Sequence, residues 1–305
     1  MAFSVTILGS NSAVPSNGRH PTAQVLSIKD HLILVDCGEG TQIQLAKYEI
    51  KVHKIEYIFI SHLHGDHFFG LIGLITSYNL NQRQKPLTVY GPKGLAEIVQ
   101  LQLHYSATQL RYELNFVEIT PENGKVILSN EHFEVTTVQL NHRIPCSGFI
   151  FKEKNTDRKI LKEALEEYKI PVDVIPSLKK GADLIMPNGT VVPNHIVTAN
   201  PPRERSYAFC TDTSYLENIV PYIKEVDLLY HEATFTSDLQ DRANETFHST
   251  AKEAATIATK AAVGKLIVGH FSGRYRELDM LLKEAKSQFS NTELALEGAC
   301  FEVTI

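Results

Sequence analysis

The chain has 305 residues, of which 43% are hydrophobic and 21% are charged, and its formal net charge is −5. This composition is ordinary for a globular enzyme and excludes a uniformly basic surface, so any RNA substrate would need a local basic patch. We find no secretory signal and no apolar run long enough to cross a bilayer. The four scattered cysteines fit reduced thiols better than disulfides or a thiolate zinc site. We therefore expect a cytoplasmic protein that does not bind membranes.

Short apolar strands alternate with amphipathic helices along the chain. The predicted strands are 4–8, 23–28, 31–35, 55–60, 87–90, 133–140, 206–210, 228–230, 265–268 and 300–304. The predicted helices are 41–48, 95–103, 251–262 and 278–288. This mixture favours a layered α/β architecture over a helical bundle or an all-β sandwich.

A cluster of possible metal ligands follows the predicted strand at 55–60. It reads His-Leu-His-Gly-Asp-His and leads into an apolar run, 68–75, that is typical of the start of a buried helix. His62 and His64 are two residues apart, so in an extended chain they point the same way and can hold one ion. Asp66 and His67 come after the glycine has turned the backbone, so they can face a second ion. Nitrogen and oxygen ligands of this kind suit zinc.

Three more ligand-type residues, His142, Asp212 and His270, each follow a predicted strand directly. Taken singly, each is more often a structural residue than a ligand. Together with the first cluster they make seven candidate ligands. Two zinc ions need that number if one carboxylate bridges them and water completes each shell. Asp212 is the expected bridge, because a carboxylate has two oxygens whereas an imidazole has one free lone pair.

Two further polar positions, Glu232 and His248, look chemical rather than ligating. Glu232 follows the strand at 228–230, and His248 precedes the helix at 251–262. Either Ser249 or Thr250 is expected to cap that helix. At a helix start His248 would lie near free amides, which favours a phosphate oxygen. The alternative is an ordinary surface histidine.

The stretch 152–205 differs from the rest of the chain because it is rich in charge and proline. It contains an amphipathic helix at 159–168 and an apparent hairpin around 187–190. These elements predict an extension that projects from the main body rather than a disordered linker. An ordinary surface excursion is the alternative.

The motif His62-x-His64-x-Asp66-His67, with His142, Asp212 and His270, resembles the metallo-β-lactamase superfamily, and alone it is specific only to that superfamily. Three further segments are similar to the ribonuclease Z family, which trims the 3′ end of precursor tRNA. These segments are Asp36-Cys37-Gly38-Glu39-Gly40, His231-Glu232-Ala233-Thr234 and His248-Ser249-Thr250. The likeness runs from Val5 to Tyr275.

The resemblance implies a four-layer αββα sandwich over 1–305, with an inserted substrate-binding arm at 152–205. It implies that one zinc is held by His62, His64, His142 and Asp212. It implies that the other is held by Asp66, His67, Asp212 and His270. Manganese is an alternative metal. Precursor tRNA is the implied substrate and a homodimer the implied assembly, with the arm gripping the tRNA elbow.

We also hypothesise the roles of three residues in hydrolysis. Asp66 would orient or deprotonate the attacking water, and His248, oriented by Glu232, would protonate the leaving 3′ oxygen. The products would be a tRNA with a 3′ hydroxyl and a trailer with a 5′ phosphate. The alternatives are another hydrolase of the superfamily that acts on small substrates, or a non-catalytic RNA-binding subunit on the same scaffold.

The arm departs from the family pattern at one point. Related arms carry a Gly-Pro pair after an Ile-Pro, whereas Ile170-Pro171 is followed here by Val172. The candidate phosphate contacts are the lysines of this stretch, namely Lys152, Lys154, Lys159, Lys179 and Lys180. Binding through them should weaken with salt.

Overall fold

The computed structural model describes residues 3–305 and divides them into two units. The larger unit is formed by the chain up to Lys152 together with Arg205–Ile305, and the smaller by Glu153–Glu204. The larger unit contains two seven-stranded sheets. The order in the first is β18 (Cys300–Glu302), β1 (Phe3–Gly9), β2 (Ala23–Ile28), β3 (His31–Val35), β4 (Ile55–Phe59), β5 (Leu87–Pro92) and β6 (Leu114–Ile119).

The second sheet mirrors the first in having a parallel half and an antiparallel half. Its order is β17 (Thr292–Leu294), β16 (Lys265–Gly269), β15 (Leu228–Glu232), β14 (Ser206–Cys210), β9 (Cys146–Glu153), β8 (Phe133–Leu140) and β7 (Lys125–Ser129). Strands β14 to β17 run parallel, as do β3 to β6 in the first sheet. Chemistry in such sheets gathers at the carboxyl ends of the parallel strands.

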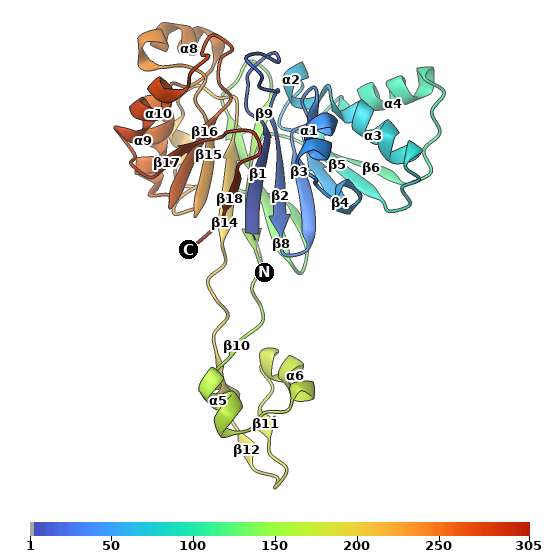
Figure 1. The fold of residues 1–305 in the computed structure, drawn as a ribbon, viewed down its shortest axis with the longest axis vertical. Coiled ribbons are helices and arrows are strands. Elements are labelled where there is room, and N and C mark those ends of the chain that lie inside the picture. Colours follow the sequence, from blue (N-terminus) through green and yellow to red (C-terminus); the bar gives the residue numbers. More distant parts are fainter. Residues whose placement is uncertain (1–2) are drawn as a thin grey trace. The chain divides into compact units, whose positions relative to one another are not determined.

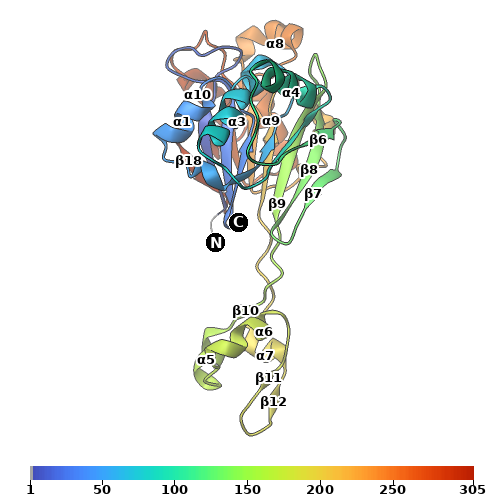
Figure 2. The same ribbon diagram turned by 90° about the vertical axis from the view of Figure 1, so that its right-hand side faces the viewer.

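Helices cover the outer face of each sheet, so the larger unit has the four layers that were predicted (Figure 1). The first sheet is covered by α1 (Thr41–Lys47), α3 (Leu71–Leu80) and α4 (Leu95–Tyr105), which Figure 2 shows from the side. The second is covered by α9 (Ala251–Ala261) and α10 (Asp279–Lys286). An aromatic-rich core that includes Phe59, Phe149 and Tyr230 fills the space between the sheets. No helix in residues 3–305 is both long and apolar enough to cross a membrane.

In the two seven-stranded sheets the structure adds four strands that the sequence pattern did not predict, β6, β7, β9 and β17. Three of them, β6, β7 and β17, are edge strands, and β7 is exposed along most of its length. An edge strand that faces solvent lacks the clear burial alternation on which a prediction depends.

The predicted helix start at 68–75 was wrong in one respect, because the chain breaks between α2 (Gly65–Phe68) and α3. The break has a specific cause. The amide of Cys37 donates to His67 O at 2.8 Å, and the amide of Gly70 donates to Cys37 O at 2.9 Å. A Cβ at Gly70 would lie 2.2 Å from Gly38 O, so only glycine permits this approach. The histidine turn is therefore pinned to the segment after β3.

The smaller unit, Glu153–Glu204, which we call the arm, has its own apolar core. It contains α5 (Lys162–Glu167), η2 (Val172–Val174), α6 (Ile175–Lys179), α7 (Asn194–Val197) and the strand pairs β10 (Lys159–Ile160) with β13 (Thr198–Ala199) and β11 (Leu184–Ile185) with β12 (Val191–Val192). The hairpin expected around 187–190 is the β11–β12 pair. The helix expected at 159–168 was wrong at its start, because 159–160 pair as a strand. Ala164, Leu178 and Val197 are buried in the arm's core.

Candidate metal centre

The turn that follows β4 places two histidines at one point. His62 is fully buried and His64 is half-buried at the start of α2. His62 Nε2 lies 3.0 Å from His64 Nδ1. From β8 of the other sheet, His142 brings its Nε2 to within 3.0 Å of the same His64 nitrogen. Three imidazole nitrogens from two sheets therefore converge.

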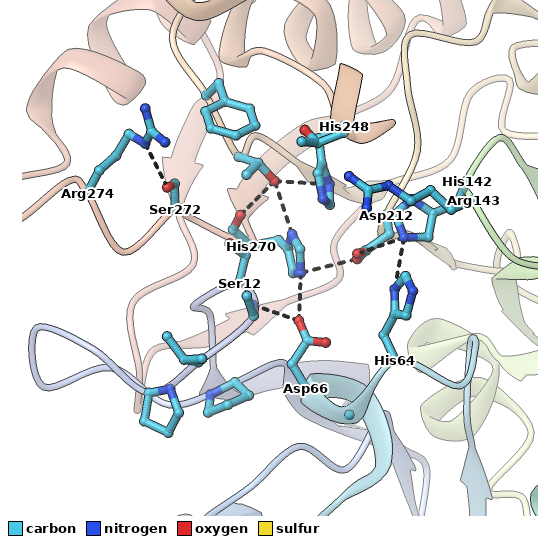
Figure 3. A pocket seen from close by; sticks show the side chains of 18 of the residues that line it. Ser12, His64, Asp66, His142, Arg143, Asp212, His248, His270, Ser272 and Arg274 are labelled. Carbon is cyan, nitrogen blue, oxygen red and sulfur yellow. Dashed lines mark hydrogen bonds and ion pairs between the residues drawn. The ribbon is translucent and has the colours of Figure 1, made fainter. Parts of the chain in front are cut away.

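Asp212 joins both halves of the site (Figure 3). It follows β14, and its Oδ2 lies 3.7 Å from His62 Nε2 and 3.6 Å from His142 Nε2. Its Oδ1 lies 3.2 Å from the Nε2 atoms of both His67 and His270. Burial alone would raise the pKa of Asp212, but the imidazoles around it hold that pKa well below its ordinary value. The carboxylate is therefore charged and faces two groups of nitrogens with different oxygens.

The second group consists of Asp66, His67 and His270. Asp66 Oδ2 lies 3.5 Å from His67 Nε2 and 3.4 Å from His270 Nε2. His270 follows β16 and has a left-handed backbone, with φ of 58°. Such a conformation is uncommon outside glycine, although histidine adopts it more often than most residues. The structure thus brings together all seven residues that were predicted as ligands.

The outer nitrogens of the histidine rings are fixed by hydrogen bonds to the protein. His67 Nδ1 donates to Asp36 Oδ2 at 2.6 Å, since a carboxylate can only accept. His142 Nδ1 donates to Phe247 O at 3.1 Å for the same reason. His270 Nδ1 lies 3.0 Å from the hydroxyl of Thr234. With the outer nitrogen protonated, the Nε2 lone pair of a neutral ring points into the site, as in metal-binding histidines.

The distances between the candidate ligand atoms are those expected around zinc. Ligands 2.0–2.1 Å from a tetrahedral zinc lie roughly 3.3–3.4 Å from one another, and the contacts within the two groups span 3.0–3.7 Å. The Nε2 of His67 is buried and makes no hydrogen bond with any described residue, although two carboxylates lie within 3.5 Å. Burial lowers the pKa of His67, but those carboxylates raise it well above its ordinary value. A bound cation would displace the proton that this ring otherwise holds.

Glu232 and His248 form a pair beside the second group. Glu232 ends β15 and is fully buried, and its Oε1 lies 2.8 Å from His248 Nδ1. Its carboxylate also accepts from the hydroxyl of Thr234 at 2.6 Å and from the amide of Thr213 at 2.9 Å. Burial alone would lower the pKa of His248, but the Glu232 carboxylate raises it to about 9. The imidazole is therefore held protonated, with its Nδ1 directed at Glu232.

The cap of α9 is Thr250, which forms a capping box with Glu253, whereas Ser249 donates to Thr213 O at 2.7 Å. His248 was expected near the free amides of this helix. Its ring lies near those of His142 and His270, with centroid distances of 5.2 and 5.3 Å. The histidine ring therefore lies beside the metal centre.

The site opens into a pocket of about 610 Å³. Its lining includes three arginines that come from different parts of the chain, Arg143, Arg242 and Arg274. Arg143 and Arg274 are labelled in Figure 3. The guanidinium of Arg274 lies 5.3 Å from the ring centroid of Phe235. A basic rim around acidic and imidazole groups is suited to a phosphodiester substrate.

Sequence reasoning missed several residues that organise this site. Asp36 is buried and accepts from the amide and hydroxyl of Ser61 as well as from His67. Thr234 links His270 to Glu232. Asp36 lies in a segment that carried the family resemblance, but nothing in its residue type revealed its partner 31 positions away. Arg143 and Arg242 gave no signal at all.

Comparisons with known proteins agree with this geometry. The family described as Anti-Pycsar protein Apyc1 matches residues 3–175. A ribonuclease Z of Cytophaga hutchinsonii is 48% identical over 305 residues, covering 100% of this chain and 97% of the relative. A ribonuclease Z of Bacteroides thetaiotaomicron is 43% identical over 301 residues, covering 99% and 95%.

Two solved structures are also similar. The short form of human tRNase Z superposes with a TM-score of 0.73 at 29% identity, covering 99% of this chain and all of that one. The metallo-β-lactamase fold protein YhfI of Bacillus subtilis superposes with a TM-score of 0.70 at 20% identity, covering 99% and 100%. The second likeness concerns the fold alone.

Proposed function

Because the chain belongs to the ribonuclease Z family and, through residues 3–175, to the family described as Anti-Pycsar protein Apyc1, we propose that it is a metal-dependent endoribonuclease that removes the 3′ trailer of precursor tRNA. The observation that supports this most is the convergence of seven ligand-type side chains beside the buried pair Glu232–His248. The site of action would be the cytoplasm.

Two zinc ions per subunit are the proposed cofactor, with manganese as the alternative. His62, His64, His142 and Asp212 would hold one ion, and Asp66, His67, Asp212 and His270 the other. Such ions, when bound, activate water at neutral pH and neutralise charge on phosphoryl oxygens. The donor set is nitrogen and carboxylate oxygen, which suits zinc.

The chain's own residues would manage the protons of the reaction. Asp66 has one oxygen held by its neighbours and would orient and deprotonate the attacking water. His248 would donate a proton to the leaving 3′ oxygen, with Glu232 fixing the ring through Nδ1 and leaving Nε2 for the substrate. The products would be a tRNA with a 3′ hydroxyl and a trailer with a 5′ phosphate.

This function is tested with a precursor tRNA that has a 3′ extension, incubated with purified protein before and after treatment with a chelator. One cut that leaves a 3′ hydroxyl on the tRNA and a 5′ phosphate on the trailer is expected, and chelation should abolish it until zinc or manganese is restored. Undiminished cleavage after chelation, or a cyclic phosphate product, would contradict the proposal. A small chromogenic diester hydrolysed with a higher kcat/KM than the tRNA would favour the small-substrate hydrolase. Binding of the tRNA without cleavage would favour the RNA-binding subunit.

The arm is the proposed binding element for the body of the tRNA. Lys159 and Lys180 are exposed on it, and Lys180 Nζ lies 3.0 Å from Asp157 Oδ1. An ion pair at such an exposed place is weak, so the lysine can exchange it for a phosphate. The arm's core is separate from those of the larger unit, which supports a role in binding rather than in folding of the catalytic body.

Replacement of residues 154–203 by a short Gly-Ser turn is expected to raise KM for precursor tRNA while sparing bound zinc and hydrolysis of a small diester. The design is possible because β9 and β14 pair antiparallel, with Lys152 opposite Ser206, so a turn can join them. The salt dependence of binding should also fall, by roughly 0.7–0.9 in the log–log slope for each phosphate that the arm neutralises. An unchanged KM would remove the arm from tRNA binding. The deletion also removes lysines. Lys286→Ala, on the larger unit, is the control that shows whether loss of a lysine outside the arm changes KM.

A homodimer is the proposed assembly. Apolar residues are exposed on and beside the helices of the first sheet, namely Ile43, Phe69, Leu80, Leu101 and Tyr105. Exposed apolar side chains on these helices supply the surface for the proposed contact between two copies of the chain. Sedimentation of the purified protein measures the assembly directly.

A further inference from the structure

The loop between β1 and β2 of the first sheet, residues 10–21, contacts the segment that follows β16 of the second sheet, and we call it the strap. Asn11 is fully buried and links several parts of the strap by hydrogen bonds. Asn11 Nδ2 donates to Val14 O at 2.6 Å and to Ser16 Oγ at 3.0 Å, and its Oδ1 accepts from Arg19 Nε at 3.1 Å. The strap is therefore a built structure with its own buried polar anchor.

The strap is joined to the segment that follows His270. The amide of Phe271 donates to Ser10 O at 2.8 Å, and the amide of Ser12 donates to Phe271 O at 2.9 Å. The Arg19 guanidinium donates to Tyr275 O at 2.5 Å. These bonds fix the backbone that directly follows His270, a candidate ligand of the second group.

The strap also contacts the opposite side of the same group. The amide of Ala13 donates to Asp66 Oδ2 at 2.8 Å, the oxygen that lies 3.4 Å from His270 Nε2 (Figure 3). Ala13 has φ of 60°, a left-handed conformation that costs an alanine free energy and persists where the surroundings impose it. Arg19 and Asn11 supply that constraint. The strained residue is the one whose amide reaches the carboxylate.

We infer that the strap is a positioning element for the second metal group, acting through the Ala13 amide on Asp66 and through the Phe271 backbone on His270. This inference rests on the proposed two-metal site. Asp66 follows a strand of the first sheet and His270 a strand of the second, so the strap holds the two across the gap between the sheets. Within residues 3–305 the strap makes no hydrogen bond to the side chains of His62, His64 or His142, so the first group does not depend on it. Removal of a partner of this kind typically weakens a metal site by roughly 10- to 100-fold.

The sharpest test replaces residue 13 by lactic acid, which changes the Ser12–Ala13 amide to an ester and removes one N–H. Zinc titration against a chelating dye should then show the second equivalent weakened by roughly 10- to 100-fold, with the first unchanged. Ala13→Gly keeps the N–H and adopts φ of 60° freely, so both equivalents should bind as in the wild-type protein. Equal weakening of both equivalents in the ester variant, or of neither, would overturn the inference.

A second variant changes Arg19, near the C-terminal end of the strap. Arg19→Ala should weaken the same zinc equivalent selectively, whereas Arg276→Ala, which removes an exposed arginine beside the carbonyl that Arg19 Nη1 contacts, should not. If the strap had only a structural role, Arg19→Ala would lower Tm and weaken both zinc equivalents alike. That result would contradict a positioning role. A wild-type protein that takes up a single equivalent would overturn the inference as well. Cleavage of precursor tRNA by the wild-type protein is measured separately, so failure of the strap and failure of the proposed function remain distinguishable.

Discussion

Substitution of Asp66 by alanine is expected to abolish turnover of precursor tRNA, with a loss of roughly 10⁴-fold or more, while the first metal group keeps its zinc. The change removes both a ligand of the second group and the proposed base for the attacking water. The first group is expected to keep its ion, because the histidines that Asp66 contacts, His67 and His270, both belong to the second group. Single-turnover cleavage and zinc content measured on the same sample give both quantities. A near-normal rate would remove Asp66 from the mechanism.

Asp212→Ala is the matched comparison, because that carboxylate faces both groups. Its Oδ1 lies 3.2 Å from the Nε2 atoms of His67 and His270, and its Oδ2 lies 3.6 Å from His142 Nε2. Loss of zinc from both groups is therefore expected, in contrast to the partial loss in Asp66→Ala. Asp66→Asn, which can still accept from the Ala13 amide, separates removal of the base from removal of that hydrogen bond. Equal zinc contents in the two alanine variants would mean that Asp212 is not a bridge.

The convergence at the site could be predicted because its members follow strand ends. His142, Asp212 and His270 are far apart in sequence, but each comes directly after an apolar strand, and strand ends meet at one edge of the sheets. Glu232 was found in the same way, at the end of β15. The strands that carry them are buried and therefore have the strong patterns on which prediction depends.

The partners that orient these residues could not be predicted, because their residue types are common and their contacts are distant. Thr234 and Ser61 are ordinary hydroxyl residues, and only the fold places one beside His270 and the other beside Asp36. The amide of Ala13 acts from 53 positions away through its backbone, which leaves no side-chain signal in the sequence. The break before α3 arises likewise from a backbone contact between segments, at Gly70.

Substitution of His248 by alanine is expected to slow cleavage by roughly 10²- to 10⁴-fold, the range for removal of a general acid, while both zinc equivalents remain. The ring lies beside the metal centre, but its Nδ1 is directed at Glu232, 2.8 Å away, rather than at the candidate ligands. Cleavage rate and zinc content are measured together, with Phe247→Ala, the exposed neighbour, as the control for a change in this loop. A fall in zinc content in His248→Ala would make the residue a ligand and remove it as the donor.

Glu232→Gln tests the same proton donor through its pH dependence. Burial lowers the pKa of His248, and the Glu232 carboxylate, with smaller contributions from Asp212 and Asp66, raises it to about 9. The ring is therefore protonated at neutral pH and loses its proton as pH rises through that value. A donor must be protonated to act, so kcat should fall on the alkaline side. Glutamine keeps the shape but removes the charge, so the pKa of His248 should fall and the alkaline limb of kcat should move to lower pH. If kcat fell but its alkaline decrease stayed at the same pH, Glu232 would have a role in holding the loop rather than in setting the protonation of His248. The direction of this shift therefore separates electrostatic control of the donor from simple support of its position.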